Sequence, residues 1–509
     1  MKINFIIFFF SLAISLSVQA QIFVSPSGND TTGTGSIDFP YRTIPKAILL
    51  AVPGDTIHLR GGIHSYSTKI SISSNGTANS MYHLFAYYGE KPVIDFSAIG
   101  GTSTDGFSLN GSFWYFKGLE IRKAPHNGIK ISAGSNNIIE HCSFHNCGNT
   151  GFQLGSSSST APYPSNNLIL NCDAYFNFDP PVGGNADGFG IKWNVGAGNV
   201  FKGCRAYNNS DDGFDLWMCL GSITIDSCWA FRNGVDIWHT GSVNGNGNGF
   251  KLGGNYVATP NTVRNCLAFD NFSKGSGGKG FDENNNMAGQ TIYNCTSFRN
   301  AFPNFSFPNN PLTSGSHIIK NCISFVGLMP DTIVNAIHDH NSWNGLIVSN
   351  SDFISLDTVQ AVAPRNAAGG LPVITLMHLT AGSSLVDAGI DVGLPFNGLA
   401  PDLGAFENQG TNEIKDNQSV VREFSLYQNY PNPFNPSTKL SFSLANGGFT
   451  MLKVYNILGK EIATLFSGDA EAGELYEFTF DVPNLSNGLY FYKLQNGNNV
   501  EIKKMILIK

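Results

Sequence analysis

Short apolar segments separated by polar residues recur over most of the chain, and each is too short for a helix. Asn167-Leu-Ile-Leu-Asn171 and Gln290-Thr-Ile-Tyr-Asn294 have the two-residue alternation of a strand of four or five residues. Each is followed at once by a copy of the pattern Cys-x-Ala/Ser-aromatic-x-Asn. Such a unit predicts coils of short strands that repeat along the chain.

Two sequence markers define these coils. Copies of the cysteine pattern recur at intervals of roughly 24 to 38 residues, at Cys172, Cys204, Cys228, Cys266 and Cys295, with partial copies at Cys142 and Cys322. A second element, x-Gly-Phe/Ile-x, occurs in the same coils as Asn127-Gly-Ile-Lys130, Thr150-Gly-Phe-Gln153, Asp187-Gly-Phe-Gly190, Asp212-Gly-Phe-Asp215, Asn248-Gly-Phe-Lys251 and Lys279-Gly-Phe-Asp282. Their agreement predicts an all-β fold, a right-handed parallel β-helix, rather than a sandwich or propeller.

The predicted register says which residues stack on one another. In stacked coils like residues lie about 4.8 Å apart, so the seven cysteines should form an interior ladder and the asparagines a ladder at a turn. We therefore expect buried packing thiols rather than disulfides or metal ligands. Cys147 and Cys219 fall outside this register, and the pattern assigns them no role.

The two ends of the repeat predict the domain organisation. A helical stretch at 41–52, with Pro45 near its start and Pro53-Gly54 at its end, suits a cap on the first coil. Residues 385–407 are expected to form the last coil and its cover. The predicted domains are a β-helix at 21–409, a polar linker at 410–423 and a small antiparallel β-sandwich at 424–509, where longer alternating strands begin.

Charge and the N-terminus limit location and partners. The net charge is only −7 and no basic run occurs, which argues against nucleic acid as a partner. Lys2, the apolar run 6–16 and the small-residue site Val18-Gln19-Ala20 predict a signal peptide at residues 1–20. No second apolar segment of spanning length follows, so we expect no transmembrane anchor in the exported protein, which we take to be monomeric.

The densest acidic segment is Ser210-Asp-Asp-Gly-Phe-Asp215. Register places Asp187 one coil below Asp212, so Asp187, Asp211, Asp212 and Asp215 should converge. Four carboxylates would raise one another's pKa values unless a cation neutralises them, and oxygen ligands in an exported protein favour Ca²⁺. The alternative is an ordinary solvated Asp-Asp-Gly turn.

Basic residues complete the candidate chemistry. Register places Lys251 one coil above Asp215, beside the predicted Ca²⁺ site, although a lone lysine can also be solvated surface. A cation and an amine together suit removal of the C5 proton of a uronate, with Lys251 as general base. Lys192 and Arg205 could meet uronate carboxylates and could equally be solvated.

At these residues the chain resembles polysaccharide lyase family 9, the pectate lyases with a ten-coil β-helix. The resemblance covers 23–407 and rests on Asn185-Ala-Asp-Gly-Phe189, the segment 198–215, Asn248-Gly-Phe-Lys-Leu252 and Lys279-Gly-Phe-Asp282. It implies that Asp187, Asp211, Asp212 and Asp215 bind calcium, that Lys251 is the Brønsted base and that the substrate is polygalacturonate, an acidic plant cell-wall polysaccharide. Rhamnogalacturonan is an open alternative. Gly190-Ile191 before Lys192 and the segment 235–246 depart from the family pattern.

The last 86 residues resemble a type IX secretion sorting domain. The resemblance rests on Tyr430-Pro-Asn-Pro-Phe-Asn-Pro436, Val454-Tyr-Asn-Ile-Leu-Gly459, Gly488-Leu-Tyr-Phe491 and the basic C-terminus. It implies export through the type IX machinery to the cell surface or the medium. A carbohydrate-binding sandwich is the alternative.

Two other classes of protein would share a β-helix with clustered aspartates. One is a polygalacturonase-type hydrolase, which uses two aspartates as acid and base without calcium. The other is a non-catalytic surface adhesin, in which the aspartates only make a turn rigid. Loss of activity with a chelator and an ultraviolet-absorbing product distinguish the lyase from both.

Overall fold

The computed structural model describes residues 20–408, apart from 242, 313–314 and 367, and residues 424–507, apart from 428, 430–431, 433, 435, 445, 473–474, 482–484 and 498. These two stretches form separate units. The predicted linker at 410–423 and the predicted signal peptide, except Ala20, lie outside the described residues.

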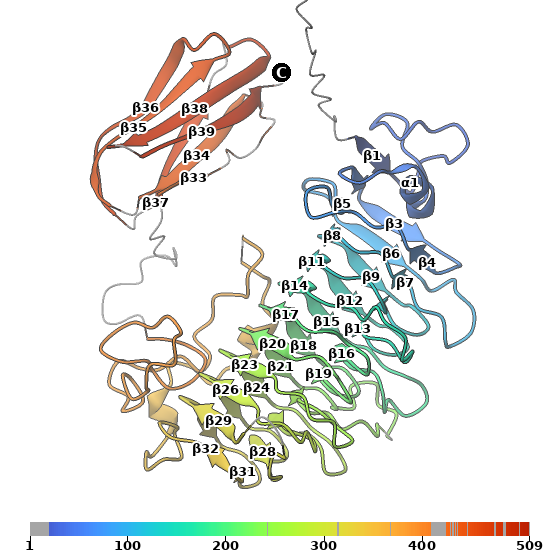
Figure 1. The fold of residues 1–509 in the computed structure, drawn as a ribbon, viewed down its shortest axis with the longest axis vertical. Helices are drawn as coiled ribbons and strands as arrows, with labels where there is room; N and C mark the ends of the chain where they lie inside the picture. The colour runs from blue at the N-terminus through green and yellow to red at the C-terminus, as the bar shows by residue number, and fades with distance from the viewer. Residues whose placement is uncertain are drawn as a thin grey trace, which may run out of the picture. The chain divides into compact units, whose positions relative to one another are not determined.

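The first unit is built from three parallel sheets that share successive coils (Figure 1). Sheet A contains β1 (Gln21–Val24), β2 (Thr56–Leu59), β5 (Tyr82–Ala86), β8 (Trp114–Lys117), β11 (Ile138–Glu140), β14 (Leu168–Leu170), β17 (Asn199–Lys202), β20 (Ile223–Asp226), β23 (Thr262–Arg264), β26 (Thr291–Tyr293), β29 (His317–Lys320) and β32 (Ala336–Ile337). Sheet B contains β3 (Gly62–Ser65), β6 (Pro92–Asp95), β9 (Glu120–Arg122), β12 (Ser143–His145), β15 (Asp173–Tyr175), β18 (Arg205–Tyr207), β21 (Trp229–Phe231), β24 (Leu267–Phe269), β27 (Thr296–Phe298) and β30 (Ile323–Phe325).

Sheet C closes each coil and carries the acidic segment. It contains β4 (Ile70–Ile72), β7 (Phe107–Leu109), β10 (Ile129–Ile131), β13 (Phe152–Leu154), β16 (Phe189–Ile191), β19 (Phe214–Asp215), β22 (Phe250–Lys251), β25 (Phe281–Asp282), β28 (Phe305–Phe307) and β31 (Thr332–Ile333). The chain passes from A to B to C and then starts the next coil, so neighbours in a sheet come from successive coils. The predicted parallel β-helix is confirmed.

The interior follows from the two sequence markers. Phe189, Phe214, Phe250, Phe281 and Phe305 are fully buried, and consecutive rings stack with centroids 4.8–5.1 Å apart. The pattern asparagines form a second ladder, in which each side-chain amide donates to the next asparagine Oδ1 at 2.9–3.1 Å along Asn177, Asn209, Asn233, Asn271 and Asn300. This ladder satisfies buried polar groups at five successive turns from sheet B to sheet C.

The cysteines behave as the register predicts. All nine are buried and free, and ladder thiols donate to backbone carbonyls, as Cys228 does to Asp226 at 3.3 Å. Cys147 occupies the asparagine position of its own coil, and its backbone N–H donates to Asn177 Oδ1 at 3.0 Å. Cys219 lies in the turn from sheet C to sheet A, where its thiol donates to the Gly221 carbonyl at 3.2 Å. Both are packing residues.

At the ends of the first unit the structure contains the predicted N-terminal helix but not the predicted last coil. Helix α1 (Ile44–Leu50) buries Ile44 and Ala47 at the first coil, as predicted, although it is shorter than the expected stretch. Residues 385–407 do not form a last coil. Leu385 and Leu403 instead pack with Phe353 against the outer face of sheet B, on Phe231 and Phe269 among others. The chain after the last coil, from about residue 350 to 407, contains η1 (Asn350–Asp352) and η2 (Thr358–Val362) and covers apolar side chains that sheet B would otherwise expose.

The second unit contains two antiparallel sheets around one apolar core, as predicted. One sheet contains β33 (Ser425–Leu426), β34 (Ser437–Ser443) and β37 (Leu475–Asp481). The other contains β35 (Gly448–Asn456), β36 (Glu461–Ala470), β38 (Gly488–Asn496) and β39 (Asn499–Leu507). In the part of the chain that the structure describes, no helix is long and apolar enough to cross a membrane.

Candidate active site on sheet C

The acidic residues meet on the outer side of sheet C, as register predicts. Phe189 pairs with Phe214 and Asp215 pairs with Lys251 in adjacent strands, so Asp187 lies one coil below Asp212 and Lys251 one coil above Asp215. One carboxylate oxygen from each of Asp187, Asp212 and Asp215 lies within 4.8 Å of the others. Asp211 is not in this set of three, although it is buried beside them.

Backbone and hydroxyl groups hold each carboxylate in place. Asp212 Oδ1 accepts from the Asn248 N–H at 2.7 Å, and Asp215 Oδ1 accepts from the Trp217 N–H at 3.0 Å. Thr150 donates its hydroxyl to Asp187 Oδ2 at 3.0 Å. The coils themselves therefore position these side chains. The second carboxylate oxygen of Asp212 and that of Asp215 each contact a lysine.

Two ammonium groups contact the cluster. Lys251 Nζ lies 2.9 Å from Asp212 Oδ2 and 3.6 Å from Asp215 Oδ1. Lys192 Nζ lies 2.7 Å from Asp187 Oδ2 and 2.8 Å from Asp215 Oδ2. Asp215 therefore lies between both lysines. If all groups ionise, four carboxylates face two ammonium groups, and two negative charges remain uncompensated.

The titration of the cluster reflects this excess of acid. Burial, together with Asp215 and Asp212, raises the pKa of Asp187 to about 7 against the opposing effect of Lys192. Burial and neighbouring aspartates also raise the pKa of Asp211 and of Asp212. Asp215 is the exception, because Lys192 and Lys251 outweigh its burial and lower its pKa. Burial lowers the pKa of Lys251, but the carboxylates outweigh it and the net shift is strongly upward.

Arg205 does not belong to this site, so the prediction that it could meet substrate is wrong. It lies in sheet B and is only 4% exposed. Its Nε and Nη2 donate to Asp173 at 2.8 and 2.9 Å, and its Nη1 donates to the Ala361 and Ala363 carbonyls, both at 2.9 Å. The guanidinium thus attaches the segment that covers sheet B to the β-helix.

Two features of the site were not predicted from sequence. The sequence predicts Lys192 as a possible substrate contact, whereas the structure pairs it with two of the aspartates. Asn246 is not among the predicted site residues: its backbone N–H donates to Asp211 Oδ1 at 2.6 Å, and its side-chain oxygen accepts from Lys251 Nζ at 3.0 Å. Its one signal in the sequence is its place in the segment 235–246, which is predicted to depart from the family pattern.

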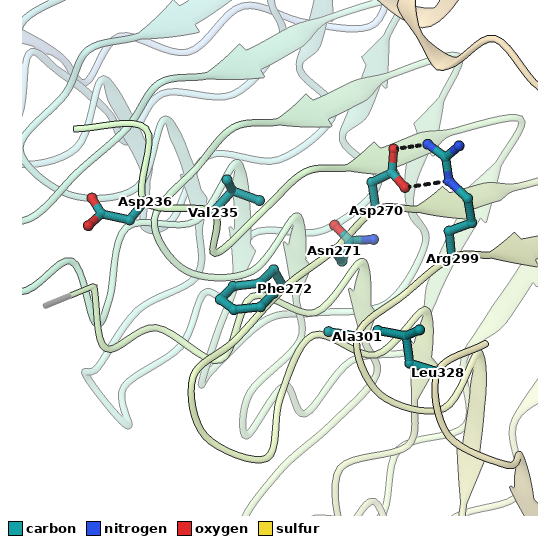
Figure 2. Close-up of a pocket in the computed structure, with 8 residues that line it drawn as sticks. All are labelled: Val235, Asp236, Asp270, Asn271, Phe272, Arg299, Ala301 and Leu328. Carbon is teal, nitrogen blue, oxygen red and sulfur yellow. Dashed lines mark hydrogen bonds and ion pairs between the residues drawn. The ribbon is translucent and has the colours of Figure 1, made fainter. Parts of the chain in front are cut away.

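A pocket of about 330 Å³ lies at the turns from sheet B to sheet C (Figure 2). Val235, Phe272 and Leu328 are among its lining residues, and Asp270 and Arg299 form an ion pair in its wall. None of the aspartates of the cluster lines it, and neither does Lys192 or Lys251. The candidate chemistry therefore lies on sheet C rather than in this pocket.

The residues of the cluster fit a divalent cation. Oxygens within 4.8 Å of one another are close enough to surround one ion at roughly the 2.3–2.6 Å typical of Ca²⁺. The donor set is made of carboxylate oxygens alone, which suits a hard cation. One divalent cation would neutralise the two negative charges that the two lysines leave uncompensated.

Comparison with known proteins agrees with this fold. Residues 22–321, more than half of the chain, match the family described as "Pel9A-like, right handed beta helix region", and residues 428–509 match the "Secretion system C-terminal sorting domain". The chain is 38% identical to pectate lyase L of Dickeya chrysanthemi over 78% of this chain and 92% of that one. It is 40% identical to pectate lyase L of Paenibacillus polymyxa over 75% of this chain and 87% of that one.

Solved structures show the same relationship. The crystal structure of pectate lyase Pel9A superposes with a TM-score of 0.70 at 37% identity, over 77% of this chain and 97% of that one. A rhamnogalacturonan lyase superposes with a TM-score of 0.63 at 27% identity, over 71% of this chain and 96% of that one. The chain therefore belongs to the Pel9A-like family of right-handed β-helix polysaccharide lyases and carries a C-terminal sorting domain.

Proposed function

We propose that this protein is a calcium-dependent pectate lyase that cleaves 1,4-linked galacturonan by β-elimination. The observation that carries the proposal is the contact between Lys251 Nζ and buried carboxylates whose oxygens can surround one ion. The relatives named as pectate lyases support the substrate class. Membership of a lyase family favours this function over the hydrolase and adhesin alternatives.

In this proposal Asp187, Asp212 and Asp215 hold Ca²⁺, with Asp211 beside them. When bound, Ca²⁺ supplies positive charge that lowers the pKa of Lys251 and stabilises the uronate carboxylate as negative charge develops on it. Burial of the aspartates strengthens these electrostatic effects, since little water reaches the side chains to screen them.

Lys251 is the proposed general base. Its side chain is 9% exposed, so a polymer lying along sheet C can meet little of it. Asp212 and Asn246 hold Nζ in place through hydrogen bonds of 2.9 and 3.0 Å, which reduces the entropy lost when the base is aligned with the C5 proton. The base must be neutral to act, and burial favours the neutral amine once the carboxylates are compensated.

The reaction needs no nucleophile from the protein. Neutral Lys251 takes the C5 proton, the electron pair left at C5 forms a double bond to C4, and the C4–O bond breaks. The departing oxygen ends as a hydroxyl after it gains a proton. The new chain end is an unsaturated uronate that absorbs ultraviolet light, which a hydrolase would not produce.

A substrate panel tests the proposal. Polygalacturonate, methylated pectin and rhamnogalacturonan are each incubated with the full chain, with and without Ca²⁺, while the unsaturated product is followed by absorbance. We expect product from polygalacturonate in Ca²⁺ only. Reducing ends without absorbance would contradict elimination.

Rhamnogalacturonan is the second candidate substrate. It is favoured by one observation, the likeness of the β-helix to a rhamnogalacturonan lyase at 27% identity. The higher identities to pectate lyases, 38 and 40%, favour polygalacturonate. Product from rhamnogalacturonan alone in the same panel would reverse this order.

We further propose that the sorting domain directs export by the type IX machinery, which would bring the enzyme to extracellular pectin. The match to a secretion-system sorting domain over 428–509 supports this. Expression with and without residues 424–509 in a bacterium that has the machinery tests it: the shortened chain should stay in the cell.

A further inference from the structure

Lys192 contacts two of the three carboxylates that a cation would need. Its Nζ lies 2.7 Å from Asp187 Oδ2 and 2.8 Å from Asp215 Oδ2, and these two residues supply two of the three carboxylates in the candidate cation site. We infer that Lys192 is a built-in competitor of the cation: its ammonium neutralises Asp187 and Asp215 in the metal-free protein and must leave them when Ca²⁺ binds. This inference rests on the proposed calcium site.

Gly190 leaves the contact between Lys192 and Asp187 open. It pairs with Asp215 in the register, and an added Cβ would lie 3.3 Å from Asp187 Oδ2, the oxygen that Lys192 contacts. The same Cβ would lie 2.7 Å from Gln153 Oε1. The absence of a side chain at Gly190 thus keeps free the space around the Asp187 oxygen that the ammonium contacts.

Electrostatics explains why the two cations exclude each other. An ammonium 2.7–2.8 Å from oxygens of Asp187 and Asp215 and an ion that contacts the same two carboxylates at about 2.3–2.6 Å would lie only a few ångströms apart. Their repulsion is large in a site that water scarcely reaches. Lys192 can leave, because its side chain is 12% exposed and the described contacts of its Nζ are these two ion pairs.

Lys251 has a different place in the cluster. It lies 2.9 Å from Asp212 Oδ2 and 3.6 Å from Asp215 Oδ1, and it has a second acceptor in Asn246. Of the two lysines, Lys192 is the one that contacts both the lower coil, at Asp187, and the middle coil, at Asp215. Its removal should therefore change cation affinity more than removal of a lysine that contacts none of the candidate ligands.

Calcium binding measured by isothermal titration calorimetry tests the inference. Lys192→Met keeps most of the side-chain volume, and we expect it to bind Ca²⁺ at least tenfold more tightly than the wild type. Lys279→Met is the matched control, since Lys279 lies just before β25 of sheet C but pairs with Asp282, at 3.0 Å, outside the cluster. We expect it to change the affinity less than twofold.

Lys192→Arg keeps a cation between Asp187 and Asp215, so we expect an affinity no higher than that of the wild type. If Lys192→Met does not fold without calcium, it can be purified with calcium and its affinity measured by competition with a chelator. Equal or weaker binding by Lys192→Met would overturn the inference, as would an equal gain in Lys279→Met. A wild type that binds no Ca²⁺ would overturn the proposed calcium site as well, which distinguishes the two failures.

Discussion

Two groups of largely buried charges are centred on different sheets of the same β-helix, and they are compensated in opposite ways. In sheet B, the carboxylate of Asp173 accepts from Arg205 at 2.8 and 2.9 Å and from Arg365 at 2.7 and 3.1 Å. In sheet C, four carboxylates share two lysines. In the first group two guanidinium groups face one carboxylate, whereas in the second two ammonium groups face four carboxylates.

The difference separates a structural role from a functional one. Burial raises the pKa of Asp173, but the two guanidinium groups outweigh it and the net shift is downward, so the carboxylate stays ionised. The pKa of Asp187 is instead raised to about 7. A carboxylate that is neutralised by cations of the protein itself stabilises the fold, whereas a cluster of carboxylates with excess negative charge is suited to bind an external cation.

The largest expected effect is loss of activity on replacement of the base. Lys251→Ala should lower turnover by about a hundred- to ten-thousand-fold, the usual contribution of a general base. Folding should persist, because Asp215 keeps Lys192 and Asp212 keeps its N–H donor from Asn248. Initial rates on polygalacturonate measure turnover, and circular dichroism measures folding. Rates in the variant equal to those of the wild type would contradict the role of Lys251 as the base.

The next effect falls on stability, in sheet B. Asp173→Asn leaves Arg205 buried without its counter-charge and should cost about 3–5 kcal/mol in the free energy of unfolding. Asp270→Asn is the matched control: its partner Arg299 is 41% exposed, so the loss should be within about 1 kcal/mol. Denaturant unfolding of the two variants gives the comparison. Similar losses would show that burial does not distinguish these pairs.

A smaller effect is expected on calcium requirement. Asp212→Asn keeps an oxygen in place but removes a charge, so half-maximal activity should need about tenfold more Ca²⁺, a change of about 1.4 kcal/mol in binding. Activity is titrated with Ca²⁺ in the variant and the wild type. An unchanged midpoint would exclude Asp212 from the ligand set.

The smallest effect concerns Glu283, a buried carboxyl whose Oε2 has no hydrogen-bond partner among the described residues. Burial raises its pKa to about 7. The folded protein therefore binds this proton more tightly than the unfolded chain, and the stability that it gives at low pH is lost as pH rises from about 4.3 to about 7.

Glu283→Gln mimics the protonated form, and its amide oxygen can still accept from Asn309. Its Tm should exceed that of the wild type by a few degrees at pH 8 and match it near pH 4. Thermal unfolding over this pH range is the measurement. A gap that stays constant with pH would mean that the carboxyl does not titrate in this range.

The sequence predicted the positions of those residues that the register of the stacked coils determines. The spacing of Gly-Phe elements placed Asp187, Asp212 and Lys251 correctly in successive coils, because parallel stacking fixes side chains to within one residue. The cysteine and asparagine ladders followed in the same way. The roles of these residues in catalysis and calcium binding remain predictions.

Contacts that depend on side-chain reach or on distant segments could not be predicted. Lys192 lies beyond the paired positions, and only its side-chain conformation brings Nζ to Asp215. Arg365, which lies 192 residues after Asp173, reaches it because the segment after the last coil folds back along sheet B. That segment has little periodicity, so the sequence offered no pairing from which to place it.

The most direct test of the calcium-dependent site is the initial rate of unsaturated product formation from polygalacturonate as a chelator is added and Ca²⁺ is then restored. The wild type should lose product formation with the chelator and recover it with Ca²⁺. Formation of the unsaturated product at an undiminished rate in excess chelator would contradict the account.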